Sequence, residues 1–334
     1  MQKIEIPAEV VSELTFDYQK ARPALKKLYE KGKVSQWNAT TDIDWSVEVN
    51  FGEPSAQSFE NSEAVASMLG LNDSPLAKLG PEGLTKFRWE FQSWMVSQFL
   101  HGEQGALVAT GRLVETVPDI DAKLYAGNQV MDEARHVEVY SKYLNEKLKV
   151  SYPISKPLEA LLLDIMTEKR WDITYLGMQI MIEGLALAAF GLANLIFQDP
   201  IIKQITDYVM RDEARHVAFG VISLQGLYDD MTEAELKDRE EFIMQAASLM
   251  RDRFLLEEVW ERVGIDPKEG TEFAKNNIVM IAFRQMLFSK IVPNLNKLGL
   301  LTERVKPKFE ELGILEFKSA VDSVTAYDPT LLNS

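Results

Sequence analysis

The sequence predicts an all-α protein with a four-helix bundle at its centre. Apolar residues recur over long segments with the helical period of about 3.6, whereas the alternating pattern of a strand is almost absent. The stretch DEARHV occurs at 132–137 and again at 212–217, 80 residues later. Both copies fall inside segments with helical periodicity, so we expect them on two helices of the same bundle.

Prolines and turn residues mark where these helices are expected to end, because a proline inside a helix removes a backbone hydrogen bond. A weak strand candidate covers 45–51, and the polar stretch 325–334 is predicted to be a loosely held tail. The segments predicted to be helical are 8–31, 57–69, 82–115, 119–148, 157–197, 199–228, 232–263 and 267–297.

No linker rich in glycine and serine divides the chain, so we predict one domain over 1–334. The core carrying the repeat is expected at about 82–228. N-terminal helices and an arm (1–81) precede it, and C-terminal helices (232–334) follow it.

Composition excludes several classes of protein. The chain has 334 residues and a net charge of −15, which disfavours binding to nucleic acid. It has no cysteine, which rules out disulfides, thiolate nucleophiles and cysteine-ligated metal sites. The first residues lack a basic region followed by an apolar stretch, so no signal peptide is expected and the predicted location is the cytoplasm.

The segment 176–197 is apolar and long enough to cross a bilayer. Glu183 lies near its middle, with Gln179 and Asn194 on either side. A lone carboxylate is costly at the centre of a membrane. We therefore predict a buried core helix of a soluble protein.

The chemical element of each DEARHV copy is Glu-x-x-His. Residues three apart share one face of a helix, so both side chains of each pair can reach one metal ion. Another glutamate precedes each pair by 30 residues, and both of these lie in mostly apolar helices. The six candidate ligands are Glu103, Glu133 and His136 in the first half, and Glu183, Glu213 and His216 in the second.

Helix geometry explains the spacing of 30 residues. Two antiparallel helices joined by a short turn bring residues equidistant from that turn to the same level. Pro118 lies midway between Glu103 and Glu133, and Pro200 lies close to midway between Glu183 and Glu213. With a rise of about 1.5 Å per residue, each pair meets about 20 Å from its turn.

Four carboxylates and two imidazoles on four helices form the ligand set of a dimetal carboxylate bundle. Four negative charges match two divalent ions, and oxygen and nitrogen donors without sulfur suit iron or manganese. We predict two iron ions, with manganese or a mixed manganese–iron pair as alternatives. A single Glu-x-x-His is more often a solvated ion pair, but two of the three histidines fall in the repeat. The third, His101, lies on a different helical face from Glu103 and is expected outside the site.

The paired motifs resemble those of the ferritin-like di-iron carboxylate oxidases and oxygenases: bacterial multicomponent monooxygenase hydroxylases, arylamine N-oxygenases and ribonucleotide reductase small subunits. GEQGALVATGRLV (102–114) is similar to the first-ligand helix of the hydroxylases. EGLALAAF (183–190), RDEARHVAFG (211–220) and QWNATTDIDW (36–45) are more similar to the reductase subunits. The resemblance implies a ferritin-like four-helix bundle with additional N- and C-terminal helices.

The resemblance also implies a second layer around the ligands. Asp212 is expected to accept a hydrogen bond from His136, and Asp132 one from His216. Arg135 and Arg215 would hold these aspartates. The alternative is that both Asp–Arg pairs are salt bridges at the surface.

Tyr140 matches the radical-bearing tyrosine of the reductase subunits, and Trp37 would then lie on the radical-transfer route. The alternative for Tyr140, which we favour, is a core tyrosine whose hydroxyl is hydrogen-bonded near the site. Two departures matter. Val209 stands where the arylamine oxygenases carry an extra histidine ligand, and Glu103 stands where many reductase subunits have aspartate.

We expect a di-iron O2-activating oxidase or oxygenase that uses O2 as co-substrate and acts on a small organic molecule in an apolar pocket. No nucleotide-binding motif is visible, so electrons should come from a ferredoxin, a reductase or the substrate. A homodimer is the expected assembly. The alternatives are a radical-generating subunit that uses Tyr140, and iron storage. The candidate pocket residues, which can equally be plain core, are Ala106, Leu107, Thr110, Leu187 and Phe190.

Overall fold

The computed structural model describes residues 3–18, 22–49, 74–197 and 199–333. Helices are the regular secondary structure of these residues, and no strand occurs among them. The prediction of an all-α protein is therefore confirmed.

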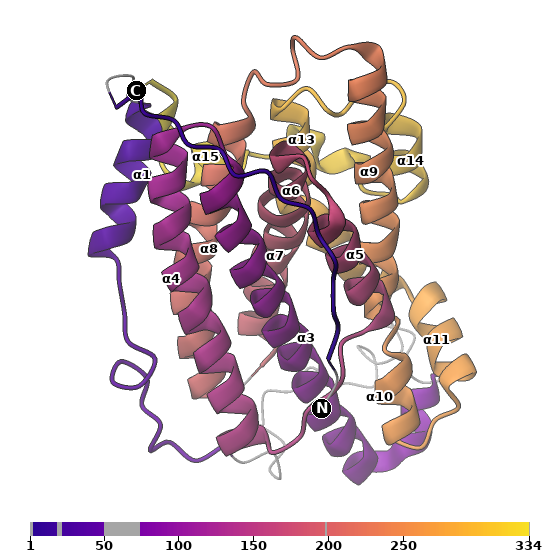
Figure 1. The fold of residues 1–334 in the computed structure, drawn as a ribbon. Coiled ribbons are helices and arrows are strands. Elements are labelled where there is room, and N and C mark those ends of the chain that lie inside the picture. Colours follow the sequence, from indigo (N-terminus) through magenta and orange to yellow (C-terminus); the bar gives the residue numbers. More distant parts are fainter. Residues whose placement is uncertain (1–2, 19–21, 50–73, 198, 334) are drawn as a thin grey trace.

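Four long helices form the centre of the molecule (Figure 1). Helix α3 packs along α4, α7 packs along α8, and α4 also contacts α8. Their bounds are Gly80–Thr116 for α3, Ile120–Tyr143 for α4, Glu183–Ile196 for α7 and Pro200–Leu224 for α8. This is the four-helix arrangement that the spacing of the repeat predicts.

Local capping explains where the second helix of each pair begins. The side chain of Asp119 accepts a hydrogen bond from the backbone N–H of Ala122 at the start of α4. The side chain of Asp199 does the same for Ile201, and Pro200 occupies the first turn of α8. An aspartate at this position satisfies an N–H that has no partner within the helix.

A π-helical segment leads directly into α7. The chain is helical from α6 (Trp171–Tyr175) through the π-helix η4 (Leu176–Ile182) to the end of α7. A π-turn inserts residues into an α-helix and is common at functional sites. Here it ends immediately before Glu183 and sets the direction of that side chain.

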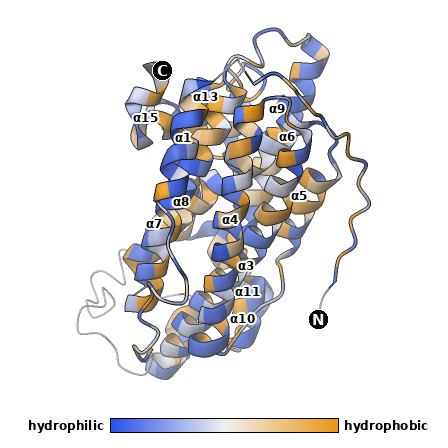
Figure 2. Ribbon diagram, turned by 60° about the vertical axis from the view of Figure 1, so that its left-hand side comes forward, coloured by the Kyte–Doolittle hydropathy of each residue, from blue (hydrophilic) through white to orange (hydrophobic). Residues whose placement is uncertain are grey.

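Shorter helices surround the centre (Figure 1). Helix α1 packs on α4 and α8, α15 packs on α8, and α5 packs on α9. Figure 2 shows a largely hydrophilic outer face on α1, whereas α12 exposes Ile278, Val279 and Met286. The bounds of these shorter helices are Pro23–Val34 (α1), Lys156–Thr167 (α5), Glu233–Asp252 (α9), Glu257–Arg262 (α10), Pro267–Asn276 (α11), Ile278–Met286 (α12), Val292–Lys297 (α13), Lys306–Glu311 (α14) and Ser323–Tyr327 (α15).

Several predicted boundaries were wrong at the N-terminus. The described part of the predicted helix 8–31 is not helical before Pro23. Residues 3–18 instead form an extended arm that runs across the bundle (Figure 1), with the N–H of Glu13 bonded to the carbonyl of Glu115. Residues 45–49 form turns rather than a strand. The predicted helix 57–69 and the rest of the strand candidate lie outside the described residues.

Three long predicted helices are interrupted in the structure. The segment 157–197 breaks at 168–170, 232–263 breaks at 253–256, and 267–297 consists of three shorter pieces. The breaks at 168–170 and 253–256 contain no proline, so the proline rule did not reveal them, whereas Pro293 lies in the first turn of α13 and does mark the last break of 267–297. The prediction of a loose C-terminal tail was also wrong, because α15 forms there and Leu331 is 2% exposed.

Two helical stretches are long and apolar enough to cross a membrane by composition, Trp171–Ile196 and Ile278–Lys297. In the first, which covers most of the apolar segment noted in the sequence, 78% of the most apolar window is buried inside the protein. Its position at the centre of the bundle accounts for its composition without a membrane.

Candidate metal centre

The structure brings all six candidate ligands together in the middle of the four-helix bundle. They fall into two groups of potential metal ligands, within which the donor atoms lie no more than 4.8 Å from one another. Glu133 belongs to both groups and can bridge two ions. The first group contains Glu103, Glu133, His136 and Glu213, and the second contains Glu133, Glu183 and His216.

All six side chains are at most 5% exposed. Helix α3 supplies Glu103, α4 supplies Glu133 and His136, α7 supplies Glu183, and α8 supplies Glu213 and His216. Each Glu-x-x-His helix runs back along its partner from the capped turn, which brings the paired glutamates to one level. The cluster can therefore hold two metal ions at the centre of the bundle.

A reciprocal pair of hydrogen bonds orients the two imidazoles. Nε2 of His136 lies 3.2 Å from Oδ2 of Asp212, and Nε2 of His216 lies 3.2 Å from Oδ2 of Asp132. Each aspartate comes from the helix that carries the other histidine. A proton on each Nε2 leaves Nδ1 free to face the glutamates and to bind a metal.

Two buried arginines hold these aspartates in place. Arg135 forms a close ion pair with Asp132 and lies 3.2 Å from Asp212. Arg215 forms a close ion pair with Asp212 and lies 3.2 Å from Asp132. Both arginines are buried, so the alternative of surface salt bridges does not hold. The two helices of the repeat are thus joined by a crossed set of charge-assisted hydrogen bonds.

The pKa values of most ligand side chains are strongly shifted by their surroundings. Burial raises the pKa of the Glu103 and Glu183 carboxyls well above their usual value, and repulsion from neighbouring carboxylates adds to this. Burial alone would lower the pKa of His136 and His216, but the surrounding carboxylates raise it well above its usual value. For Glu133 burial acts upward, yet the two imidazoles bring its pKa well below the usual value.

Unsatisfied polar atoms provide a direct test of whether the site fits metal ions. Oε2 of Glu133, Oε2 of Glu183, both carboxylate oxygens of Glu213 and Nδ1 of His216 are buried and make no hydrogen bond in the described structure. Two of these atoms face an ionisable neighbour instead: Nδ1 of His216 lies 3.1 Å from Oε1 of Glu133, and Oε1 of Glu213 lies 3.2 Å from Nδ1 of His136. Leaving so many polar atoms unpaired in one place is costly unless something else binds them. The atoms without partners are the donors that two ions require, so the residues fit a dimetal centre.

Gln129 is part of this centre, although the sequence did not single it out. Its Nε2 donates hydrogen bonds to Oε1 of Glu133 and Oε1 of Glu183, both at 2.9 Å. It lies one helical turn before Glu133 on α4 and is fully buried. A glutamine four residues before a ligand is the only signal in the sequence. Val209, its counterpart in the second half, is buried and offers no donor.

The residues one helical turn after the two ligand histidines also differ between the two halves of the repeat. Tyr140 lies one turn after His136, and its ring contacts those of Phe99 and Phe190, with centroid distances of 5.8 and 6.0 Å. Its hydroxyl has no hydrogen-bond partner among the described residues, contrary to the hydrogen-bonded tyrosine that we favoured from the sequence. The residue one turn after His216 is Gly220, and Gln179 of the π-helix packs against it.

Trp37 connects the centre to the N-terminal segment. Its indole N–H donates to Oδ2 of Asp212 at 2.7 Å, and its ring stacks on Tyr208 with 4.8 Å between centroids. Asp212 in turn bonds to His136, so the three residues form a continuous hydrogen-bonded chain. His101 lies outside the cluster, with Nε2 2.9 Å from the carbonyl oxygen of Tyr152.

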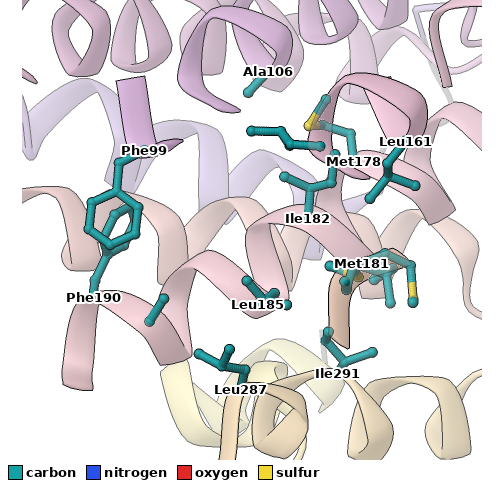
Figure 3. Packing of buried hydrophobic residues seen from close by; sticks show 14 of the residues in the cluster. Phe99, Ala106, Leu161, Met178, Met181, Ile182, Leu185, Phe190, Leu287 and Ile291 are labelled. Atoms are coloured by element: carbon teal, nitrogen blue, oxygen red, sulfur yellow. The ribbon is translucent and has the colours of Figure 1, made fainter. Parts of the chain in front are cut away.

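Two cavities lie beside the centre. A narrow one of about 20 Å³ is bounded by Glu103, Glu183 and Glu213. Figure 3 shows much of its apolar wall, which includes Phe99, Ala106, Ile182, Leu185 and Phe190.

The second cavity, of about 1050 Å³, is lined by Trp37, Asp212 and Arg215 on the outer side of the aspartates. Of the predicted pocket residues, Ala106 and Phe190 line the narrow cavity and Leu187 lines the large one. Leu107 and Thr110 line neither of these two cavities, and their place in a substrate pocket stays a prediction.

No protein-family model and no curated protein matches the chain. Solved structures with a similar fold are R2-like ligand-binding oxidases with a reconstituted manganese–iron cofactor. A valine-to-isoleucine variant is 17% identical over 91% of this chain and 95% of its own, with a TM-score of 0.44. A glycine-to-leucine variant is 19% identical over 88% and 94%, with a TM-score of 0.46. A further structure of this oxidase is 18% identical over 91% and 94%, with a TM-score of 0.43.

At this level of similarity function does not transfer from one protein to the other. The fold and the cluster of this chain themselves define a four-helix bundle of the ferritin-like type whose buried carboxylates and imidazoles can hold two metal ions. Its chemistry is inferred from its own side chains.

Proposed function

We propose that the protein is a dimetal oxidase or oxygenase that uses O2 to oxidise a small organic substrate. The observation that supports this most strongly is the set of buried carboxylate oxygens without partners, which adjoins a cavity with apolar walls. A metal site placed next to an apolar cavity suits O2 and an organic substrate, both of which enter such a space more readily than ions do.

Two bound iron ions, or a manganese and an iron ion, would supply the redox chemistry for the reduction of O2. The protein's own residues have separate tasks. Glu103, Glu133, Glu183 and Glu213 balance the charge of two divalent ions, and His136 and His216 complete the donor sets. The Asp–His hydrogen bonds fix the tautomer and the orientation of each imidazole, and Phe99 and Phe190 exclude water from the cavity next to the ligands.

The direct test is metal loading followed by exposure to O2. Protein loaded with iron(II) without air should hold about two ions per chain, as the two ligand groups require. Adding O2 should then give rapid O2 uptake together with a change in the absorption of the iron. A metal content that stays near zero, or loaded protein that does not consume O2, would contradict the proposal.

A second candidate function is a subunit that passes an oxidising equivalent to a partner protein. The chain of hydrogen bonds from Trp37 through Asp212 to His136 supports it, because it links the centre to an indole ring that lines the large cavity. The lone hydroxyl of Tyr140 gives a proton released there no acceptor, which favours the first candidate. Electron paramagnetic resonance after O2 exposure separates the two, since only the second predicts a long-lived tyrosyl signal.

We further propose an external electron donor such as a ferredoxin or a reductase, a homodimeric assembly and a cytoplasmic location. The donor proposal rests on the lack of a nucleotide-binding motif in the sequence. Sedimentation of the purified protein tests the dimer. Reduction of the metal-loaded protein by a ferredoxin and its reductase tests the donor.

A further inference from the structure

Arg253 is a buried arginine with an unusual lack of partners. It is 6% exposed, and its Nε has no hydrogen-bond partner within the described residues. Burial alone lowers the pKa of its guanidinium, to about 10, and no carboxylate opposes this effect. The side chain lies over the ring of Phe254 at 5.6 Å, which compensates only part of the desolvation.

The other buried arginines of the described structure all have acceptors. Arg135 and Arg215 bind the aspartates of the metal centre. Arg239 makes two hydrogen bonds with the carboxylate of Asp172, at 2.9 and 3.0 Å. Arg284 donates to the backbone carbonyls of Ala274 and Lys275. Burying a guanidinium without such an acceptor costs desolvation free energy. An anion from outside the chain is therefore its natural partner.

The backbone positions Arg253 at the narrow cavity. Helix α9 ends at Asp252, and a short 3₁₀ turn, Arg253–Leu255, follows. Leu256 then adopts φ 61° and ψ 33°, a left-handed conformation that leucine rarely takes. Such strain is kept where the surrounding structure requires it, and often at functional sites. The break brings Arg253 and Phe254 together into the wall of the cavity.

The cavity separates Arg253 from the metal ligands. Its lining contains the carboxylates of Glu103, Glu183 and Glu213 and a single basic residue, Arg253. The remaining wall is mostly apolar, including Phe99 and Phe190, which Figure 3 shows in contact. A molecule in this cavity would contact a cation, the carboxylates of three metal ligands and apolar side chains.

With two divalent metal ions bound, the charges of the centre cancel without the positive charge of Arg253. The six acidic residues of the cluster and its second layer are balanced by Arg135, Arg215 and two divalent ions. The positive charge of Arg253 has no counterpart in this balance. One monoanion bound in the cavity would restore neutrality.

We propose that Arg253 binds the carboxylate of the substrate, so that the substrate is a carboxylic acid whose apolar part faces the metal ligands. This inference rests on the proposed function, since it assigns the substrate class of the same site. A guanidinium presents parallel N–H donors that match the two oxygens of a carboxylate. The small cavity, of about 20 Å³, makes short aliphatic acids the appropriate first probes.

The test compares propanoate with propanamide, which has nearly the same shape but no charge. Both are titrated calorimetrically into protein loaded with manganese(II), so that binding is measured without turnover. We expect the parent protein to bind propanoate at least about tenfold more tightly than propanamide, as a charge-assisted pair implies. Arg253→Met should abolish this preference and leave the binding of propanamide unchanged.

Arg251→Met is the matched control, because it removes a cation two residues away that pairs with Asp252 outside the cavity. It should retain the preference for propanoate. Arg253→Met should also unfold at the same or a higher temperature than the parent, because it removes an unpaired buried charge. A large loss of stability would instead indicate a structural partner and would overturn the proposal.

Propanoate that binds no better than propanamide to the parent, or equally well to Arg253→Met, would also overturn the inference. Should Arg253→Met not fold, Arg253→Lys decides, since a lysine keeps the charge but loses the paired donors and should weaken propanoate binding. The measurement does not involve O2. A failure of the proposed oxidase activity therefore leaves the result on Arg253 intact, and the two failures can be told apart.

Discussion

Glu183 shows at the scale of a single residue how an apolar segment can serve a polar centre. It is 2% exposed, follows a π-helix, and receives one hydrogen bond, from Gln129. Its other carboxylate oxygen has no partner in the described structure. A buried carboxyl in this state binds either a proton or a metal cation.

We therefore expect Glu183→Ala to abolish the O2 reaction and to reduce bound iron from about two ions per chain toward one. The ion bound by Glu133 and His216 would lose one of its three donors. Glu183→Gln keeps the volume but not the charge, and should give the same loss of metal. Metal analysis and O2 uptake decide this, and parent-like uptake by either variant would show that Glu183 is not a ligand.

Tyr140 distinguishes the two candidate functions at the same scale. For an oxidase or oxygenase, Tyr140→Phe should keep the metal content and change the rate of the O2 reaction by no more than about fivefold. Stability should not fall, because the variant removes a buried hydroxyl that has no partner. Complete loss of activity, with loss of a tyrosyl radical signal that the parent shows, would instead support the radical-generating subunit.

The residues of the site could be predicted from the sequence only where a regular spacing identifies them. The six candidate ligands were recognisable because the repeat places them at equal offsets on helices. Gln129 and Arg253 were not, since one glutamine and one arginine carry no pattern until the fold brings Gln129 to the ligand glutamates and Arg253 to the narrow cavity. The hydrogen bond expected for Tyr140 was misjudged for a related reason, because its ring packs against aromatic rings from other helices and its hydroxyl has no partner among the described residues.

At the scale of helices, the contact between α8 and the π-helix sets the position of His216. A Cβ added at Gly220 would lie 2.6 Å from Cβ of Gln179, an atom close to the backbone that cannot swing away. Gly220→Ala should therefore push the two helices apart and destabilise the protein by about 1–3 kcal/mol. It should also weaken the ion bound by His216.

Gly127→Ala on α4 is the matched control, because nothing lies within 4 Å of the added Cβ. That change should stabilise the protein slightly, by up to about 1 kcal/mol, through helix propensity alone. Urea denaturation of both variants measures the difference. If Gly220→Ala left the free energy of unfolding unchanged, the contact between α8 and the π-helix would not be tightly packed.

The starts of the long helices were predictable, and their internal breaks were not. Pro81, Pro118 and Pro200 mark turns that the structure confirms within a few residues. The break at 253–256 lacks both proline and glycine, and Leu256 adopts its left-handed conformation because packing holds it there. The arm at 3–18 has a helical pattern in part, but the backbone N–H of Glu13 bonds to the carbonyl of Glu115 in the last turn of α3 instead.

At the scale of the whole molecule, metal binding should govern how stability depends on pH. In the metal-free protein the pKa values of Glu103, Glu183, His136 and His216 are all raised by folding. A raised pKa contributes stability below the unfolded value, and this is lost as pH rises through the folded value. For the histidines the loss therefore extends upward from about pH 6.5.

The metal-free protein should accordingly lose stability between neutral and alkaline pH, whereas the loaded protein should not. Metal ions replace the protons at the same side chains, and their apparent affinity should rise with pH. Thermal unfolding at a series of pH values, with and without a chelator, measures both trends. A gap between loaded and metal-free protein that stays constant across this range would contradict the assignment of the ligands.

The two ligand groups differ in the donor side chains that they offer, and this difference should set the order in which two metal ions bind. One group offers four side chains and the other three, and Gln129 occupies an oxygen of two members of the smaller group. Unequal donor sets bind with unequal affinity, so a metal titration should show two steps, the first at the group containing Glu103. In a centre that fills stepwise, the order in which the metals arrive decides which metal occupies which site. The sequence of metal supply during maturation, more than the total amounts, would then decide which pair of ions the finished protein carries.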